Sequence, residues 1–220
     1  ALITPQQSES VIRWPAGNTK ILNMVGIAIK PVVGKSIGFE ATSNAGATAT
    51  SLTFAHTVGT VGTGASRALI VGVSNSLGVI PTSVTYGGVA MTYLASVVIT
   101  TFDCSVWFLT ETNGLLAGVN NVIVTFAGAQ DIRAGAISYT NVHPTATPSN
   151  GVLALAATST FPDYQCAIVN VDNTYFGGRL VGFSATDDVV GMNIGQDETS
   201  RWDANQGTVR GTGSDRALTI

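Results

Sequence analysis

The sequence TSLTFAHTV at residues 50–58 and the sequence RALIVGVS at residues 67–74 decide the fold. In the first stretch large side chains alternate with small or hydroxyl-bearing ones, and the large ones are Leu52, Phe54, His56 and Val58. A period of two residues is typical of a β-strand with one buried face. In the second stretch residues 68–73 form a nearly continuous apolar run, which indicates a central strand.

The rest of the chain repeats this pattern of short apolar runs between turns. The further runs cover residues 82–86, 89–99, 104–109, 121–126, 132–142, 165–171, 179–184 and 199–202. Turn-forming pairs stand between them at Gly87-Gly88, Asn113-Gly114, Asn150-Gly151 and Gly177-Gly178. No stretch of four turns has the apolar spacing of an amphipathic helix. Many short strands at about ten-residue spacing predict an all-β fold, a β-sandwich or jelly roll.

The composition excludes several classes of protein. Charged residues make up 10% of the chain, against roughly 25% in an average soluble domain, whereas 45% are apolar and the mean hydropathy is +0.34. A disordered chain has low hydropathy and high net charge instead. A net charge of −3 without any basic run argues against nucleic-acid binding. No window of about 20 residues is predominantly apolar, so we expect no membrane-spanning helix.

The first forty residues differ from the rest in charge. They hold all three lysines and Arg13 against two glutamates, a net charge of +2, whereas residues 41–220 carry six basic and eleven acidic side chains, a net charge of −5. Two strand-like pieces lie in this part, residues 10–14 and the strongly apolar residues 21–29. We therefore predict an extended N-terminal arm, residues 1–36, and a β-sandwich domain, residues 37–220.

Seven segments of the predicted domain carry a resemblance to a known family. They are the two stretches quoted first and SVTYGGVAMT (83–92), SVWFLTE (105–111), GVNNVIVTF (118–126), AGAISYTNV (134–142) and ETSRWD (198–203). From about Ile37 onward the chain resembles β-sandwich domains of secreted bacterial and archaeal surface proteins and of phage structural proteins. The resemblance implies a mostly non-catalytic role and a place on the cell surface or in a virion.

One departure from this family concerns the last strand. In the family a segment like GTGSDRAL (residues 211–218) precedes a full strand, which here is shortened to about four residues. A shortened strand leaves an open sheet edge, which proteins normally cover. We expect the apolar part of the arm to act as a donor strand for a neighbouring subunit. Its residues are Ile21, Leu22, Met24, Val25, Ile27 and Ile29.

Two questions about the arm stay open at this point. The arm either completes the sheet of a neighbouring subunit or folds back on its own sandwich. The alternation along the segment also allows either of its faces to fill the groove. One face consists of Ile21, Val25, Ile27 and Ile29, and the other of Leu22, Met24 and Ala28.

No arrangement of catalytic residues is recognisable, and we expect no enzymatic activity. His56 shares the apolar face of its strand, which favours a hydrogen-bonded core residue, and His143 precedes Pro144 in a turn, so neither indicates a zinc site. Asp187 and Asp188 lie in a turn-like stretch and are weak candidates for a calcium site. Apart from calcium we expect no cofactor.

Two cysteines and three tryptophans complete the candidate residues. Cys104 and Cys166 form either a disulfide, as in extracellular proteins, or two buried thiols. We expect Trp107 in the core, Trp202 at a rim under a loop and Trp14 against a neighbour. Aromatic rings exposed at the surface would be able to bind carbohydrate by stacking.

These observations predict a non-enzymatic structural subunit of an extracellular filament or pilus-like assembly, a homopolymer linked by strand donation. The chain holds 28 threonines and 17 serines and few charges. A surface rich in such residues would suit packing against copies of the same chain. Two alternatives are a virion protein, such as a decoration or tail-fibre protein, and a carbohydrate-binding adhesin domain.

Overall fold

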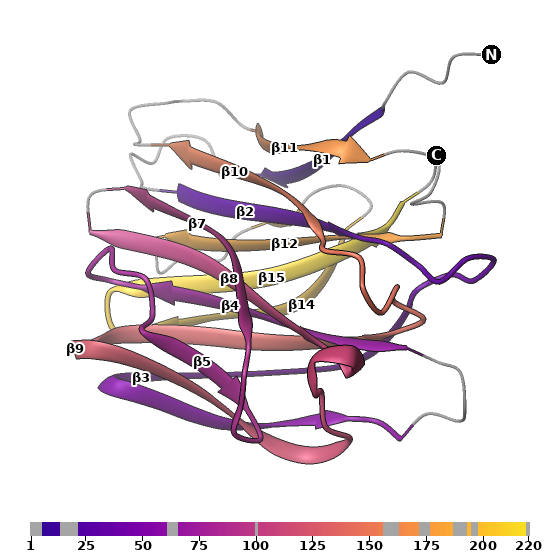
Figure 1. Ribbon diagram of the computed structural model, residues 1–220. Helices are drawn as coiled ribbons and strands as arrows, with labels where there is room; N and C mark the ends of the chain where they lie inside the picture. The colour runs from indigo at the N-terminus through magenta and orange to yellow at the C-terminus, as the bar shows by residue number, and fades with distance from the viewer. Residues whose placement is uncertain are drawn as a thin grey trace.

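The computed structural model describes residues 6–13, 22–60, 66–99, 101–155, 163–171, 177–186, 193–194 and 198–218. These residues fold almost entirely into β-strands, joined by turns and one short 3-10 helix, η1 (Glu111–Asn113). Figure 1 shows the strands stacked in layers. The predicted all-β fold and its sandwich architecture are therefore confirmed.

The strands form three sheets, and paired strands are antiparallel in all of them. The largest has the order β6 (Val89–Ala90), β5 (Ser83–Tyr86), β9 (Gly118–Thr140), β4 (Arg67–Asn75), β8 (Phe102–Thr110) and β7 (Thr92–Ile99), and β3 (Gly38–Val58) pairs with β9. The five-stranded sheet has the order β10 (Ser149–Leu155), β2 (Leu22–Ile29), β12 (Arg179–Thr186), β15 (Val209–Ala217) and β14 (Thr199–Gln206). The three-stranded sheet consists of β11 (Asp163–Val171), β1 (Gln6–Arg13) and β13 (Asn193–Ile194).

Strand β4 lies in the interior, as its apolar sequence predicts, because both of its faces are covered. All nine of its residues are buried. Ile70 contributes to a first core, which faces the five-stranded sheet, whereas Leu69 and Val71 contribute to a second core on the opposite face. Two cores on either side of one strand explain why the sequence there shows no alternation.

The second core is closed by a long antiparallel pair of strands that are far apart in the sequence, β3 and β9. Strands β3 and β9 pair along almost their whole length, with a register shift between Ala49 and Ser51. Beyond this shift the residues of β3 are alternately exposed and buried, and Leu52, Phe54 and Val58 point into the second core. The alternation read from residues 52–58 is thereby confirmed.

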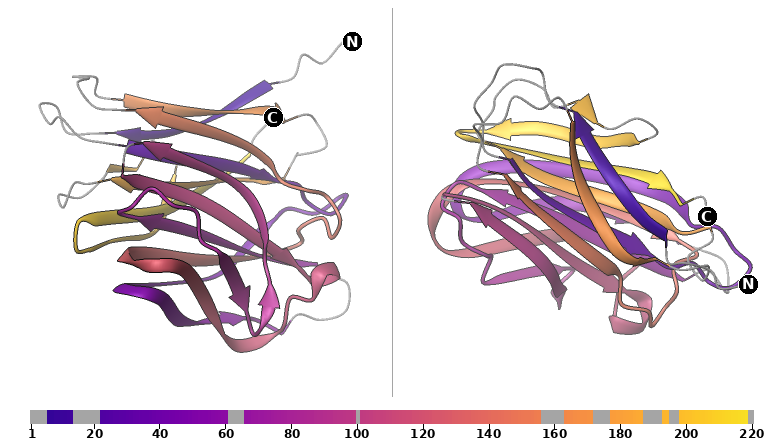
Figure 2. Two further views of the ribbon diagram at one scale, coloured as in Figure 1. Left: turned by 60° about the vertical axis from the view of Figure 1, so that its left-hand side comes forward. Right: turned by 90° about the horizontal axis from the view of Figure 1, so that it is seen from above.

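The two large sheets approach each other along their sides, so that the sandwich nearly closes into a barrel. Strand β10 lies next to β7 on one side, and β14 lies next to β3 on the other. Figure 2 shows β10, β11 and β1 together at one end of the molecule. The small sheet thus lies beside the five-stranded sheet, next to β10, rather than beside the β3–β9 pair.

The last described strand differs from the expectation. Most of the segment GTGSDRAL lies inside the nine-residue strand β15, and residues 219–220, which follow it, lie outside the described residues. β15 is paired on both sides, with β12 and with β14. Among the described strands, the edges of this sheet are β10 and β14. The arm strand β2 lies inside the sheet, between β10 and β12.

Candidate assembly site

The candidate site is the space between β10 and β12 that β2 fills, which we call the β2 groove. Strand β2 pairs with β10 over seven residue pairs, from Leu22 to Ala28, and with β12 over eight, from Leu22 to Ile29. Neither pairing contains a register shift. In Figure 1 the indigo strand β2 lies between two orange strands that are far from it in the sequence.

One row of β2 side chains points into the first core. Val25, Ile27 and Ile29 are at most 1% exposed and pack with residues of both large sheets, including Phe183 and Ile70. These are three of the four residues on one predicted face of the arm, and the fourth, Ile21, lies outside the described residues. Of the two faces considered from the sequence, the one with Val25, Ile27 and Ile29 is therefore the face that points into the first core.

The other row of β2 is covered as well. Met24 and Ala28 are 1% and 0% exposed, and Ala28 packs against Leu180 and Leu218. The side chain of Leu22 lies outside the described part of the chain, although its backbone is the first residue of β2. Strand β2 is thus paired on both edges and covered on both faces, the environment of a central strand.

A short connection, residues 30–37, joins β2 to β3 and follows the surface of the same sandwich. The amide of His143 donates to the carbonyl of Lys30, and the amide of Val32 donates to the carbonyl of Asn141. At the other end of the connection, the amide of Ile37 donates to the carbonyl of Gly177. These few backbone contacts hold the arm strand to its own chain outside the groove.

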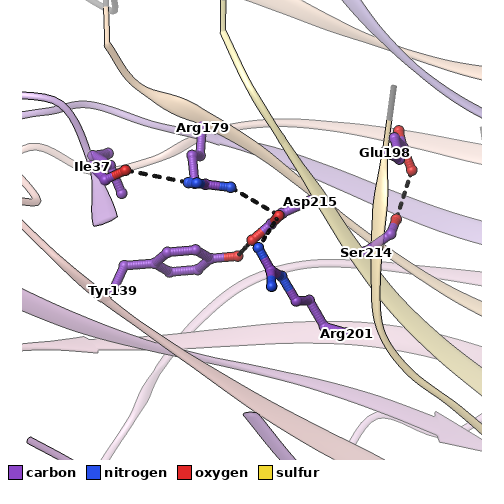
Figure 3. Close-up of polar contacts among 7 residues, drawn as sticks. All are labelled: Ile37, Tyr139, Arg179, Glu198, Arg201, Ser214 and Asp215. Atoms are coloured by element: carbon purple, nitrogen blue, oxygen red, sulfur yellow. Dashed lines mark hydrogen bonds and ion pairs between the residues drawn. The ribbon is translucent and has the colours of Figure 1, made fainter. Parts of the chain in front are cut away.

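A buried ionic cluster lies near this connection and was not foreseen from the sequence. The carboxylate of Asp215 accepts hydrogen bonds from Arg179 Nη1 at 2.9 Å, from Arg201 Nη2 at 2.8 Å and from the Tyr139 hydroxyl at 2.6 Å (Figure 3). Arg179 Nε also donates to the carbonyl of Ile37 at 3.3 Å. The four charged or polar side chains come from β9, β12, β14 and β15.

The chemistry of this cluster is that of a structural tie. The Asp215 side chain is fully buried, and its two arginines satisfy the charge. Burial raises the pKa of Tyr139 well above its ordinary value, and the neighbouring Asp215 adds to the shift, so the phenol stays protonated as a hydrogen-bond donor. The guanidinium of Arg201 stacks on the Phe39 ring, 3.6 Å from its centroid.

The histidines lie where the sequence predicted them. His56 is 2% exposed, its Nδ1 lies 2.8 Å from Ser43 Oγ, and burial lowers its pKa to about 4. His143 lies in a turn, where its Nδ1 accepts hydrogen bonds from the amides of Thr145 and Ala146. The core role of His56 and the turn role of His143 are confirmed.

The candidate metal ligands and cysteines are only partly covered by the structure. Asp187 and Asp188 lie outside the described residues, and within the described part of the chain no group of three His, Cys, Asp or Glu side chains could hold a metal ion. Cys104 is buried in β8, whereas only the backbone of Cys166 is described, in β11. Calcium binding and the disulfide stay predictions.

Of the tryptophans, Trp107 is buried as predicted, but the prediction for Trp202 is wrong. Trp202 is 4% exposed and belongs to the first core, so its ring is not available at a rim for stacking on a sugar. Its neighbours explain the burial: glycines on β9 and β15 leave space for the indole. Trp14 lies outside the described residues.

Among the described residues there is no helix that is long and apolar enough to cross a membrane. A comparison of the chain with protein-family models, curated proteins and solved structures found no match. The family suggested by the sequence motifs therefore stays a prediction.

Proposed function

We propose that this protein is a non-enzymatic structural subunit of an extracellular filament, in which each subunit inserts its arm strand β2 into the β2 groove of the next. The observation that carries the proposal is the composition of the five-stranded sheet. Its second strand, β2, comes from the N-terminal arm, whereas both neighbours of β2 come from the last third of the chain. A strand from a second copy would find the same partners.

The groove contacts are the same whichever copy supplies the strand, so exchange costs little free energy. Burying Met24, Val25, Ile27 and Ile29 stabilises the sheet by on the order of 10 kcal/mol. Exchange between subunits retains this contribution, whereas the contacts of residues 30–37 with the same chain are replaced. Exchanging an identical element is a low-cost route to assembly, and a head-to-tail exchange that does not close gives a filament.

The surface supports the same proposal. Charged residues make up roughly 25% of an average soluble domain, whereas they make up 10% of this chain. The exposed positions of β3 are typical, with Thr42, Asn44, Thr48 and Thr50. Hydroxyl and amide groups of this kind can be covered by another subunit at a lower desolvation cost than charges.

A disulfide between two differently labelled chains tests the exchange. Ala28 of β2 is directly opposite Leu180 of β12. One chain carries Ala28→Cys, and a second, isotope-labelled chain carries Leu180→Cys. The two chains are folded together and oxidised. Peptide mass spectrometry then identifies the disulfides and distinguishes the new bond from any at Cys104 or Cys166. Exchange predicts a bond between the light and the heavy chain.

A matched control places the first cysteine at Val33, which is 88% exposed, and measures bonds formed by random collision. If the Ala28 chain forms no more bonds to the Leu180 chain than the Val33 chain does, β2 stays in its own sandwich and the proposal is wrong. Electron microscopy of the same material separates filaments from a capsid or tail structure, which would assign the protein to a virion.

A further inference from the structure

The row of β2 side chains that faces the first core begins with a polar residue. Asn23 is 0% exposed and precedes Val25, Ile27 and Ile29 in this row. Asn23 is paired with Ala185 of β12 on one side and with Ala154 of β10 on the other. Because the alanine side chain of β12 is short, the Asn23 amide can extend across the core toward the opposite sheet.

The amide of Asn23 makes one specific contact there. Asn23 Nδ2 donates a hydrogen bond of 2.6 Å to the backbone carbonyl of Phe102, the first residue of β8. A carbonyl oxygen only accepts, so this contact also fixes which end of the amide points to β8. Asn23 Oδ1 is buried and has no hydrogen-bond partner among the described residues. A buried amide that is only partly satisfied is a poor source of stability.

The apolar row alone does not determine how far β2 enters the groove. A slip of one residue would turn the row away from the core, which the burial pattern opposes. A slip of two residues keeps the row inward. In one direction the places of Ile27 and Ile29 are still filled by β-branched side chains, so the apolar pattern discriminates weakly against that register. In the other direction Lys30 takes the buried place of Ala28, which opposes that register until Lys30 is replaced by cysteine.

Asn23 discriminates between them. In one displaced register Asn23 takes the place of Val25, opposite Phe183, where the core is apolar. In the other, Val25 takes the place of Asn23 and presents methyl groups to the Phe102 carbonyl. Each displacement breaks the cross-sheet hydrogen bond between Asn23 and Phe102. The first displacement also buries the whole amide without a partner, which is costly.

We propose that Asn23 is the register-determining residue of β2, which selects one position of the strand in the β2 groove. Residues 30–37 hold the C-terminal end of the strand while the arm is bound to its own chain. During exchange these contacts open, and the amide at the other end then sets the register. The inference rests on the proposed function for its importance in assembly, but the register itself is measurable whichever chain supplies the strand.

The register is read from disulfides between β2 and Leu180 of β12. In the observed register Ala28 is opposite Leu180, and a displacement of two residues brings Gly26 or Lys30 there instead. We would prepare three proteins that carry Leu180→Cys together with Ala28→Cys, Gly26→Cys or Lys30→Cys. Each protein is refolded and oxidised, and the yield of the disulfide is measured by peptide mass spectrometry. With Asn23 present we expect the displaced pairs to form on the order of tenfold less than the Ala28 pair.

Substitution Asn23→Leu, of nearly the same shape, is then added to each protein. We expect the displaced pairs to rise to a similar yield as the Ala28 pair, while the sandwich stays folded because an apolar side chain suits the core. Val25→Leu is the matched control and should keep the Ala28 pair dominant.

If Asn23→Leu leaves the displaced pairs as rare as before, the apolar row and the connection fix the register, and the inference is overturned. Bonds within one chain or between two chains report separately on exchange. A chain that keeps β2 in its own sandwich but loses its register with Asn23→Leu contradicts the proposed function and supports this inference.

Discussion

The indole of Trp202 lies directly against the Cα atom of Gly135: a Cβ at residue 135 would stand 2.1 Å from Trp202 Cε2. Gly135 of β9 is paired with Gly72 of β4, and a Cβ at residue 72 would meet the Phe183 ring at 2.0 Å. The two rings belong to the five-stranded sheet and are tilted by 42° to each other. Two adjacent glycines of one sheet thus accept two aromatic rings of the other.

We expect Gly135→Ala and Gly72→Ala each to destabilise the fold by about 2 kcal/mol or more, because the rings have no room to move within a packed core. Gly128→Ala is the matched control, since a Cβ at residue 128 would have no neighbour within 4 Å. Urea denaturation measures the three free energies of unfolding. Equal stability of Gly128→Ala and Gly135→Ala would show that the indole does not rest on Gly135.

Asp215→Asn should cost about 3–5 kcal/mol, because it leaves Arg179 and Arg201 without their shared counter-charge inside the protein. Asp203→Asn is the control: its pair with Arg210 also joins β14 to β15, but its side chain is 26% exposed. Exposed ion pairs contribute roughly 0–1 kcal/mol. Thermal unfolding at low and high salt compares the two variants, and a similar loss in both would argue against a structural role for the cluster.

These two contacts mark the limit of what the sequence predicts. The alternation of residues 52–58 and the apolar run of residues 68–73 are local patterns, so the strands they form were predicted correctly. The place of Trp202 depends on Gly135, and that of Phe183 on Gly72. These pairs are distant in the chain, so no local sequence pattern predicts their contact. The residues around Asp215 likewise come from four separate strands.

Strand lengths show the same limit. The sequence predicts separate runs at residues 121–126 and 132–142, whereas the structure has one strand, β9, from Gly118 to Thr140. The alternation is interrupted at residues 127–129, which are exposed where the strand bends. The first half of β3 was missed because it is rich in Ala, Thr and Ser and only partly buried. For the β2 groove, the apolar row was visible in the sequence, but the hydrogen bond of Asn23 to Phe102 required the opposite sheet.

Asp103→Asn should remove a pH dependence of stability. Asp103 is 0% exposed, and burial raises its pKa to about 7. Between the unfolded pKa of about 4 and the folded pKa, the folded protein holds a proton that the unfolded chain has released, so stability falls as the pH rises, by about 1.4 kcal/mol per pH unit. Urea denaturation from pH 4.5 to 7.5 should give this slope as the difference between the original chain and the variant. A constant difference would mean that Asp103 titrates normally.

His56→Gln should remove a contribution to stability of the opposite slope. Burial lowers the pKa of His56 to about 4, so between pH 4 and about 6.5 the unfolded chain binds a proton that the folded protein does not. This group makes stability rise with pH in the same window in which Asp103 makes it fall. The two contributions offset each other in the original chain up to about pH 6.5, and only the Asp103 contribution continues to pH 7. We therefore expect Asp103→Asn to make stability rise more steeply with pH and His56→Gln to make it fall, with the double variant parallel to the original chain below pH 6.5. Two variants with slopes of the same sign would contradict the burial of one of the two groups.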